Sequence, residues 1–387
     1  MRLYLRAARL AALILILATA AWGQATFTQS TGPDLPGKDG GTPRLVAGPY
    51  VQNVSTSAAT TVWQTDCPTS AELSLSDGGA AETFRTDTPR RLAEVRVGKL
   101  VPDSLYTYSV RIGNQPVAGG SFRTFPLAPR PVRFIVYGDT RTNPDRHRQV
   151  IEAMAREPGV EFVLHTGDVV SDGRKLDVWI PEFLGPAEKM MRSVPFFPVL
   201  GNHEHNSASY FTYFALPGNE RYYSFDLGEI HIIALDSNTG FDIGSEQCKW
   251  LIRDLAAHRE ARWKFVFMHH PTYTSGSHGA VSESGVPKET PIRLAQELLP
   301  KLAKQFGITA VFAGHDHAYE RSVRDGVTYV VTGGGGAPSY GDPNARHNPY
   351  RKVFYSGLHC CLVSVDGNGA GMIVKTPKGK IIDRIDL

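Results

Sequence analysis

The chain has few cysteines, and none of them is arranged as a metal-binding pair. Four occur in 387 residues, namely Cys67, Cys248, Cys360 and Cys361. Because no Cys-x-x-Cys pair is present, a zinc–thiolate site is not expected. Four cysteines allow three disulfide connectivities, and the sequence does not choose among them. If Cys360 and Cys361 belong to a strand, their side chains point to opposite faces of its sheet.

The chain also lacks an excess of charge outside its first residues. It carries 41 basic and 38 acidic residues, a formal charge of +3. Arg2, Arg6 and Arg9 account for this excess, because residues 1–23 contain no acidic residue. The remainder is therefore neutral and has no basic tail or stripe. We expect no nucleic-acid-binding patch.

A long apolar run is missing as well. The run from Leu10 to Trp22 has 13 residues and is broken by Thr19, whereas a span of the bilayer needs about 20. Basic residues precede it and small residues follow it, with Ala21-x-Gly23 and Gly23-x-Ala25 as cleavage motifs. The pattern predicts a secretory signal peptide at 1–23, a secreted or periplasmic protein, and no stable membrane span. A membrane anchor is the alternative.

Residues 24–125 fall into two parts. Residues 24–43 are rich in Gly, Thr, Pro and Ser, which predicts a disordered lead-in. Residues 44–125 show short alternating runs separated by turn signals, which predicts a small all-β sandwich. The predicted strands are Thr60–Gln64, Ala71–Leu75, Leu92–Val97, Tyr106–Ile112 and Ser121–Phe125. No cluster of reactive residues lies here, so an accessory module is favoured over a carbohydrate- or surface-binding domain.

After a Pro-rich linker at 126–131, residues 132–387 alternate between strand-like and helix-like segments, which indicates an α/β domain. The predicted strands are 132–137, 161–165, 196–200, 264–268 and 308–313, with a hairpin at 222–235. The predicted helices are 145–156, 175–192 (interrupted by prolines), 246–258 and 292–306. Only β segments are expected afterwards, ending with 361–365, 371–374 and 380–385.

Metal-type ligands follow five of these strands. They occur in Gly138-Asp139, Gly167-Asp168, Gly201-Asn202-His203-Glu204, His269-His270-Pro271 and Gly314-His315-Asp316-His317. Each motif alone is weak, since Gly-Asp and Gly-Asn are common turn dipeptides. Open α/β sheets place ligands beyond the carboxyl ends of their strands. Five such groups in one domain therefore predict a shared site.

This series of motifs, with the extension Ala318-Tyr319-Glu320-Arg321, resembles the calcineurin-like metallophosphoesterases. The extension and the preceding β domain are similar to those of the purple acid phosphatase subgroup. Leu100-x-Pro102-x-Ser104-x-Tyr106-x-Tyr108 also resembles the tyrosine-corner segment of fibronectin type III domains. The resemblance covers roughly residues 44–387. It implies a fibronectin type III-like domain at 44–125 and a four-layer α/β/β/α sandwich of two mixed sheets at 132–387.

The resemblance also implies two metal sites, with Fe, Mn or Zn as the ions. The first would use Asp139, Asp168 and His317. The second would use Asp168, Asn202, His269 and His315. Carboxylate and amide oxygens together with imidazoles suit these ions.

Three further side chains are expected to contact the substrate, a small or surface-borne phosphate ester. His203 matches the phosphate-contacting histidine of the family, and His278 lies in a Gly/Ser-rich loop where purple acid phosphatases carry such histidines. His270 is expected to lie behind the ligands. Arg141 stands where other metallophosphoesterases have a ligand histidine, and its planar fork could bind two phosphate oxygens. Alternatives are local hydrogen bonds or surface ion pairs.

One departure from the resemblance concerns the first metal. Purple acid phosphatases carry a tyrosine ligand three residues after the bridging Asp, and Ser171 stands there instead. The first site is thus one protein ligand short. We consider that His147, on the inward face of helix 145–156, supplies it; the alternative is a local hydrogen bond.

The expected function is that of an exported, metal-dependent phosphoric ester hydrolase resembling acid phosphatases. A phosphomonoesterase is favoured. A phosphodiesterase with the same ligands and a surface-binding protein with a decayed site are the rivals. Gly333-Gly334-Gly335-Gly336 lacks the spacing of a dinucleotide loop, so a loop in close contact with the site is expected.

Overall fold

The computed structural model describes residues 26–27, 35, 37–86, 88–113, 115–341 and 347–387. The predicted signal peptide lies outside these ranges, as does half of the lead-in at 24–43. No helix in the described ranges is both long and apolar enough to cross a bilayer. All four cysteines are buried as free thiols.

The N-terminal part is a sandwich of two four-stranded sheets. One sheet has the order β1 (Thr26–Phe27), β6 (Arg90–Gly98), β3 (Ala58–Thr69) and β2 (Leu45–Gln52). The other has the order β5 (Glu82–Arg85), β4 (Ala71–Ser76), β7 (Leu105–Ile112) and β8 (Gln115–Arg123). The predicted alternating runs begin within these strands, and burial alternates residue by residue along β4. Strands β1, β2 and β5 were not among the predicted runs, and β1, which pairs with β6, lies within the segment predicted as a disordered lead-in.

One contact of this sandwich matches the geometry of a tyrosine corner. The backbone N–H of Val101 donates a hydrogen bond to the hydroxyl of Tyr106 at 2.9 Å. This is the upstream backbone contact that defines such a corner. The fibronectin type III likeness of the whole domain stays a prediction.

The C-terminal part contains two mixed sheets. The six-stranded sheet runs β11 (Phe196–Pro198), β10 (Val160–His165), β9 (Val132–Tyr137), β19 (Cys360–Val365), β20 (Ala370–Lys375) and β21 (Ile381–Asp386). The seven-stranded sheet runs β12 (Tyr223–Leu227), β13 (Ile230–Ala234), β14 (Trp263–Phe267), β15 (Ala310–Ala313), β17 (Val327–Thr332), β16 (Tyr319–Arg324) and β18 (Arg351–Tyr355). Phe134 and Phe265 meet between the sheets, with ring centroids 5.4 Å apart.

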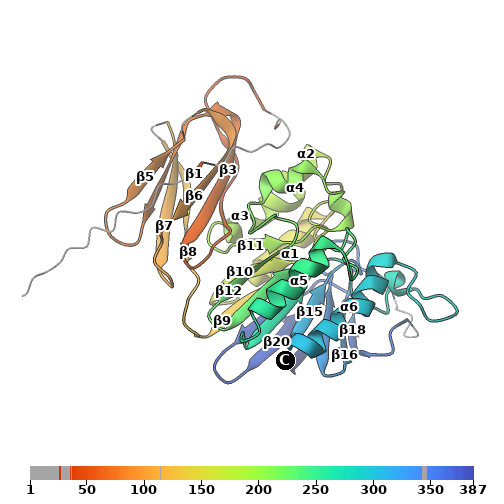
Figure 1. Ribbon diagram of the computed structural model, residues 1–387. Coiled ribbons are helices and arrows are strands. Elements are labelled where there is room, and N and C mark those ends of the chain that lie inside the picture. The colour runs from red at the N-terminus through yellow and green to blue at the C-terminus, as the bar shows by residue number, and fades with distance from the viewer. Residues whose placement is uncertain (1–25, 28–34, 36, 87, 114, 342–346) are drawn as a thin grey trace, which may run out of the picture.

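Helices complete the predicted four layers. The six-stranded sheet is accompanied by α1 (Pro144–Met154), α2 (Leu176–Trp179) and α3 (Gly185–Met191). Helices α5 (Glu246–Ala257) and α6 (Thr290–Phe306) lie together over the other sheet (Figure 1). A π-helical turn, Ile180–Leu184, joins α2 to α3 where one interrupted helix was predicted. The short helix α4 (Ala208–Tyr213) was not predicted.

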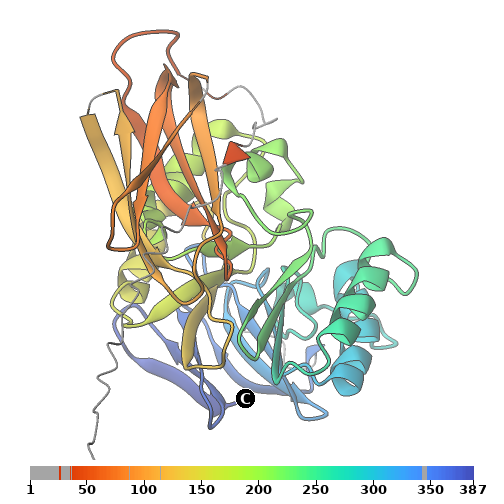
Figure 2. The same ribbon diagram turned by 60° about the vertical axis from the view of Figure 1, so that its left-hand side comes forward.

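The sandwich lies against the α/β part (Figure 2), and the two parts share one apolar core. Phe125, just after β8, packs against Phe162 and Phe197, with ring centroids 5.8 and 6.2 Å away. The hydroxyl of Tyr50 on β2 donates to the carbonyl of Tyr213 at 2.9 Å. The two parts are therefore held by both apolar and polar contacts.

The four-glycine stretch lies against the loop that carries Asp139, as expected. A Cβ on Gly333 would lie 2.3 Å from the carbonyl oxygen of Asp316 and 2.9 Å from Asp139 Oδ2. A Cβ on Gly335 would lie 2.4 Å from the carbonyl oxygen of Gly138. Side chains are excluded at both positions, so the glycines permit this close packing.

Candidate metal centre

All six predicted metal ligands lie together at the carboxyl ends of parallel strands. Strands β9, β10 and β11 are parallel, as are β13, β14, β15 and β17. The loops that follow them turn sharply: Asp139, Asp168 and His315 have φ values of 57°, 54° and 72°. Such backbone conformations are uncommon for residues other than glycine and concentrate at functional sites. The ligand atoms of Asp139, Asp168 and His269 lie within 4.8 Å of one another.

Four side chains surround one of the two expected metal positions. His269 Nε2 lies 2.9 Å from Asn202 Oδ1, 3.3 Å from Asp168 Oδ1 and 3.1 Å from His315 Nδ1. Atoms bonded tetrahedrally to one ion at about 2.1 Å lie about 3.4 Å apart. These separations, with the mixed oxygen and nitrogen donors, fit a transition-metal ion at this position.

The opposite nitrogen of each ligand histidine has its own acceptor. His269 Nδ1 donates to the carbonyl oxygen of Thr166 at 2.8 Å, and His317 Nδ1 donates to that of Pro338 at 2.7 Å. His315 Nε2 lies 3.0 Å from Glu289 Oε2. Such partners fix the ring and the tautomer of metal-binding histidines. The remaining nitrogens are thereby directed into the site.

The other expected metal position has fewer protein ligands. His317 Nε2 lies 3.6 Å from Asp139 Oδ1, and Asp168 lies nearby. The guanidinium of Arg141 extends between them, with Nε 3.3 Å from Asp168 Oδ2 and Nη2 3.4 Å from His317 Nε2. Two carboxylates and an imidazole are suitable ligands for a metal ion. The cationic side chain of Arg141, however, already contacts Asp168 and His317.

His147 does not complete this position, which contradicts our hypothesis. Its Nε2 lies 3.1 Å from the hydroxyl of Tyr137, and its Nδ1 lies 3.0 Å from the carbonyl oxygen of Glu182. Its ring is fully buried and stacks on Phe183. Both nitrogens are used by local hydrogen bonds, so this histidine belongs to the core behind the site.

Two further histidines border the site. His203 Nδ1 donates to the carbonyl oxygen of Ser171 at 2.7 Å, and its Nε2 lies 3.8 Å from Asp168 Oδ2. His278 Nδ1 lies 2.6 Å from Glu289 Oε1, and its ring centroid is 3.8 Å from that of His315. Both side chains are 29% exposed, so a substrate can reach them.

His270 lies behind the ligands, as expected. Its Nδ1 is 2.8 Å from the hydroxyl of Ser237, and its ring packs 4.4 Å from that of His315. It supports the position of His315 from the protein side.

Two buried or half-buried carboxylates shape the loops of the site. Glu204 accepts hydrogen bonds from the backbone N–H groups of Gly201, Asp168, Val169 and Val170 at 2.6 to 3.3 Å. Glu182, in the π-helical turn, accepts from the N–H and the hydroxyl of Ser171, both at 2.7 Å. Ser171 occupies the position of the tyrosine ligand of purple acid phosphatases, and here it is hydrogen-bonded to Glu182.

The electrostatics of the site favour the protonation states that metal binding needs at His269, His317 and Asp168, but not at Asp139. Burial lowers the pKa of His269 and of His317 to about 4, so both imidazoles are neutral near pH 7. Burial alone would raise the pKa of Asp168, but His269, His203 and Arg141 lower it to about 2. Burial, together with the charge of Asp168, raises the pKa of Asp139. A bound cation would relieve the repulsion between these two carboxylates.

A cavity of about 230 Å³ adjoins the site. Its lining includes Asp316, which separates two of the ligand histidines, and Tyr340, whose ring stacks on that of His317 at 4.2 Å. Drug-sized ligands occupy pockets of about 300 Å³ or more, so this cavity suits a small group.

Comparison with known proteins agrees with this geometry. Residues 132–319 match the family described as calcineurin-like phosphoesterase. The match covers 188 of the 387 residues, and we call the C-terminal part the phosphoesterase domain after this likeness. Residues 42–129 match a domain of unknown function.

Purple acid phosphatases are among the relatives of the chain. It is 29% identical to "Probable purple acid phosphatase 20" of Arabidopsis thaliana in an alignment 296 residues long, which covers 68% of this chain and 66% of the relative. It is 28% identical to "Purple acid phosphatase 15" of the same plant over 62% of this chain and 53% of that protein. The alignments thus span between half and two thirds of these two relatives.

Two solved structures share the fold. A purple acid phosphatase from yellow lupin (Lupinus luteus) seeds superposes with a TM-score of 0.72 at 16% identity, covering 92% of this chain and 75% of that one. The structure of PhoD superposes with a TM-score of 0.66 at 14% identity, covering 86% of this chain and 91% of that one. Both likenesses include the N-terminal sandwich as well as the phosphoesterase domain.

Sequence reasoning missed several residues that border the site. Glu289 and Tyr340 lie in loops without periodicity. Glu289 ends the Gly/Ser-rich stretch Thr272–Glu289 that carries His278, but no pattern there indicates a contact with the ligands. Glu204 was visible as the last residue of the Gly-Asn-His-Glu motif, but its role in holding the Asp168 loop needs the fold. Glu182 was hidden in a segment where prolines obscured the helical pattern.

Proposed function

We propose that the chain is an exported, metal-dependent phosphatase that hydrolyses phosphate monoesters at this centre. The observation that carries the proposal is the convergence of Asp168, Asn202, His269 and His315 within hydrogen-bond distance at the strand ends. Export is supported by the apolar leader alone. Fe, Mn or Zn would suit the donors, and two ions would use Asp168 as the shared ligand.

The centre can hold the phosphoryl group from several sides. Ions bound there would neutralise its charge and lower the pKa of a water that attacks phosphorus. Arg141 presents a planar fork at the rim of the ligands, which suits two phosphoryl oxygens. Its guanidinium would move from Asp168 toward the substrate as the ligands take up their ions.

His203 is placed to serve the leaving group. Because its Nδ1 is bound to the carbonyl oxygen of Ser171, its Nε2 is directed toward the site. A protonated imidazole held there can donate its Nε2 proton to the departing oxygen. The adjoining cavity, bordered by Tyr340, would accept the organic part of a small ester.

The test compares p-nitrophenyl phosphate with bis(p-nitrophenyl) phosphate, after reconstitution with Mn, Fe or Zn. We expect faster turnover of the monoester, and loss of turnover in Asn202→Ala with the fold retained by circular dichroism. Faster turnover of the diester would identify a phosphodiesterase instead. No turnover of either ester with any of the metals would support a binding protein with a decayed site.

A further inference from the structure

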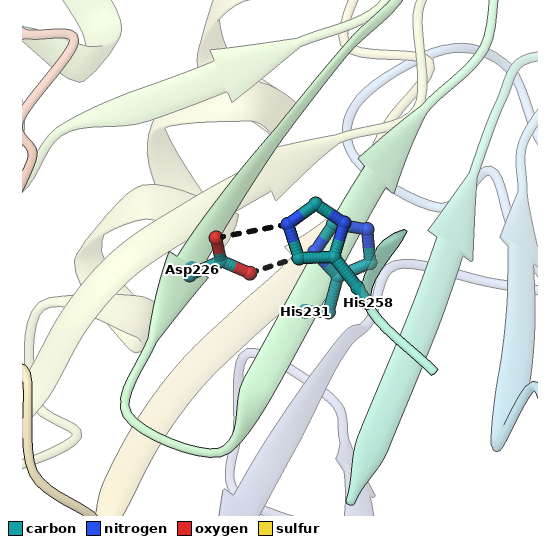
Figure 3. A group of neighbouring side chains, drawn as sticks. All are labelled: Asp226, His231 and His258. Carbon is teal, nitrogen blue, oxygen red and sulfur yellow. Dashed lines mark hydrogen bonds and ion pairs between the residues drawn. The ribbon is translucent and has the colours of Figure 1, made fainter. Parts of the chain in front are cut away.

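A second cluster of metal-type ligands lies near the amino ends of β13 and β14 in the seven-stranded sheet, away from the strand ends that carry the phosphoesterase centre. Asp226 on β12 and His231 on β13 stand directly opposite each other in an antiparallel pair. His258, which follows α5, stacks on His231 with ring centroids 3.9 Å apart (Figure 3). His231 pairs with Lys264 near the start of β14, whereas His269 follows the end of that strand. The cluster is therefore separate from the phosphoesterase centre.

The carboxylate of Asp226 faces both imidazoles (Figure 3). Its Oδ1 lies 2.7 Å from His231 Nδ1, and its Oδ2 lies 3.5 Å from His258 Nε2. One ligand atom from each of the three residues lies within 4.8 Å of the other two. Ligands of a tetrahedral zinc ion are about 3.4 Å apart. The distance between Asp226 and His258 is already close to this value. A small rotation of the Asp226 side chain, which is 51% exposed, would lengthen its 2.7 Å distance to His231.

The opposite nitrogens of both rings are held by one residue. His231 Nε2 lies 2.8 Å from Asp254 Oδ2, and His258 Nδ1 donates to the backbone carbonyl of Asp254 at 2.8 Å. The other carboxylate oxygen of Asp254 accepts from the hydroxyl of Ser224 at 2.9 Å. Metal-binding histidines are oriented in this way by carboxylate and carbonyl acceptors. His231 Nδ1 and His258 Nε2 are thus the nitrogens left for an ion.

We propose that Asp226, His231 and His258 form a second, independent binding site for Zn²⁺ or another borderline divalent ion. Two imidazoles and a carboxylate are ligands that such ions prefer. The buried side of the site is supplied by His231, and solvent reaches it past His258, which is 32% exposed. A water would take the fourth position, as in sites with three protein ligands. The ion would tie the β12–β13 hairpin to the end of α5.

The experiment counts zinc in the full chain. The wild type, Asp226→Asn and His258→Ala are stripped with a chelator, loaded with Zn²⁺ and analysed by inductively coupled plasma mass spectrometry. We expect each variant to hold one zinc equivalent fewer than the wild type and to hydrolyse p-nitrophenyl phosphate at the wild-type rate. Glu246→Gln, on the exposed side of α5, is the control and should retain the wild-type count.

A second measurement covers the case of a variant that folds poorly. Zn²⁺ should raise the Tm of Asp168→Asn, whose change lies in the phosphoesterase centre, by binding to the folded state at the second site. Adding His258→Ala to this variant should remove most of that rise. Equal zinc counts in the wild type and both single variants, or a zinc-induced rise in Tm that persists without His258, would overturn the proposal. The cluster would then be an ion-pair network only.

Discussion

Glu289 Oε2 lies 3.0 Å from His315 Nε2, on the side of the ring opposite to the nitrogen that faces His269. The other oxygen of the same carboxylate lies 2.6 Å from His278 Nδ1. One residue just before α6 therefore orients both a candidate metal ligand and a candidate substrate contact. No sequence motif marks it.

The substitution Glu289→Gln should weaken the centre without unfolding the chain. An amide can accept a hydrogen bond from only one of the two rings with its single oxygen, so the other histidine loses its orientation. Loss of such a support costs about 10- to 100-fold in metal affinity or activity. Metal titration and kcat/KM for p-nitrophenyl phosphate would measure the loss. Glu283→Gln, exposed in the same loop, should leave both quantities unchanged.

The substitution Arg141→Lys should raise KM for a phosphomonoester more than it lowers kcat. Lysine keeps the charge but cannot present two parallel N–H donors to phosphoryl oxygens. We expect an increase in KM of about tenfold, which corresponds to ~1.4 kcal/mol. Steady-state kinetics check this, with Arg148→Lys on α1 as the control. Unchanged kinetics would assign Arg141 to structure alone.

Iron-loaded protein should lack the visible charge-transfer band of a tyrosinate ligand. The relevant position is Ser171, and its N–H and hydroxyl are both bound to Glu182. Burial raises the pKa of the neighbouring Tyr340 to about 12, which keeps this phenol protonated near neutral pH. Absorption spectra of the Fe(III) form test the expectation, and an intense purple colour would contradict it.

Acidification should destabilise the fold through its buried neutral histidines. Burial lowers the pKa of His147 and of His359 to about 4, whereas the unfolded value is about 6.5. As the pH falls, these histidines therefore bind protons in the unfolded chain before they do so in the folded chain. Each of these groups costs ~1.4 kcal/mol of stability per pH unit as the pH falls from about 6.5 toward 4.

Denaturant titrations at several pH values measure this slope. His359→Gln should be less stable near pH 7, because it disturbs a buried hydrogen-bonded ring, yet its stability should fall less steeply with acid. The exposed His205→Gln serves as the control and should keep the wild-type slope. A wild-type stability that is constant between pH 6.5 and 4.5 would show the prediction to be wrong.

The strand ends could be predicted because each follows a short apolar run, and the residues after it are turn formers with metal-type side chains. Parallel strands then bring those ends to one edge of the sheet, which requires no knowledge of the loops. His147 shows where this reasoning stops. The helical pattern correctly placed it on the inward face, but the hydroxyl of Tyr137 and the carbonyl of Glu182 occupy its nitrogens.

The supporting carboxylates could not be predicted for a different reason. Glu289 is 26 residues from His315, and Glu204 is 36 residues from Asp168. Such contacts depend on the way in which the long loops close over the sheet. No periodic pattern in the sequence indicates this loop conformation. The fold and the expected ligands thus follow from local patterns, whereas their orientation depends on distant partners.

The packing of Phe125 and Tyr50 against the phosphoesterase domain also bears on how the protein can be divided. A fragment that begins at residue 132 would lose the contact of Phe125 with the rings of Phe162 and Phe197. The sandwich alone would lose the backbone partner of its Tyr50. Neither part is thus an independent folding unit. A chimaeric enzyme that exchanges one of them would need a redesigned interface between the two parts.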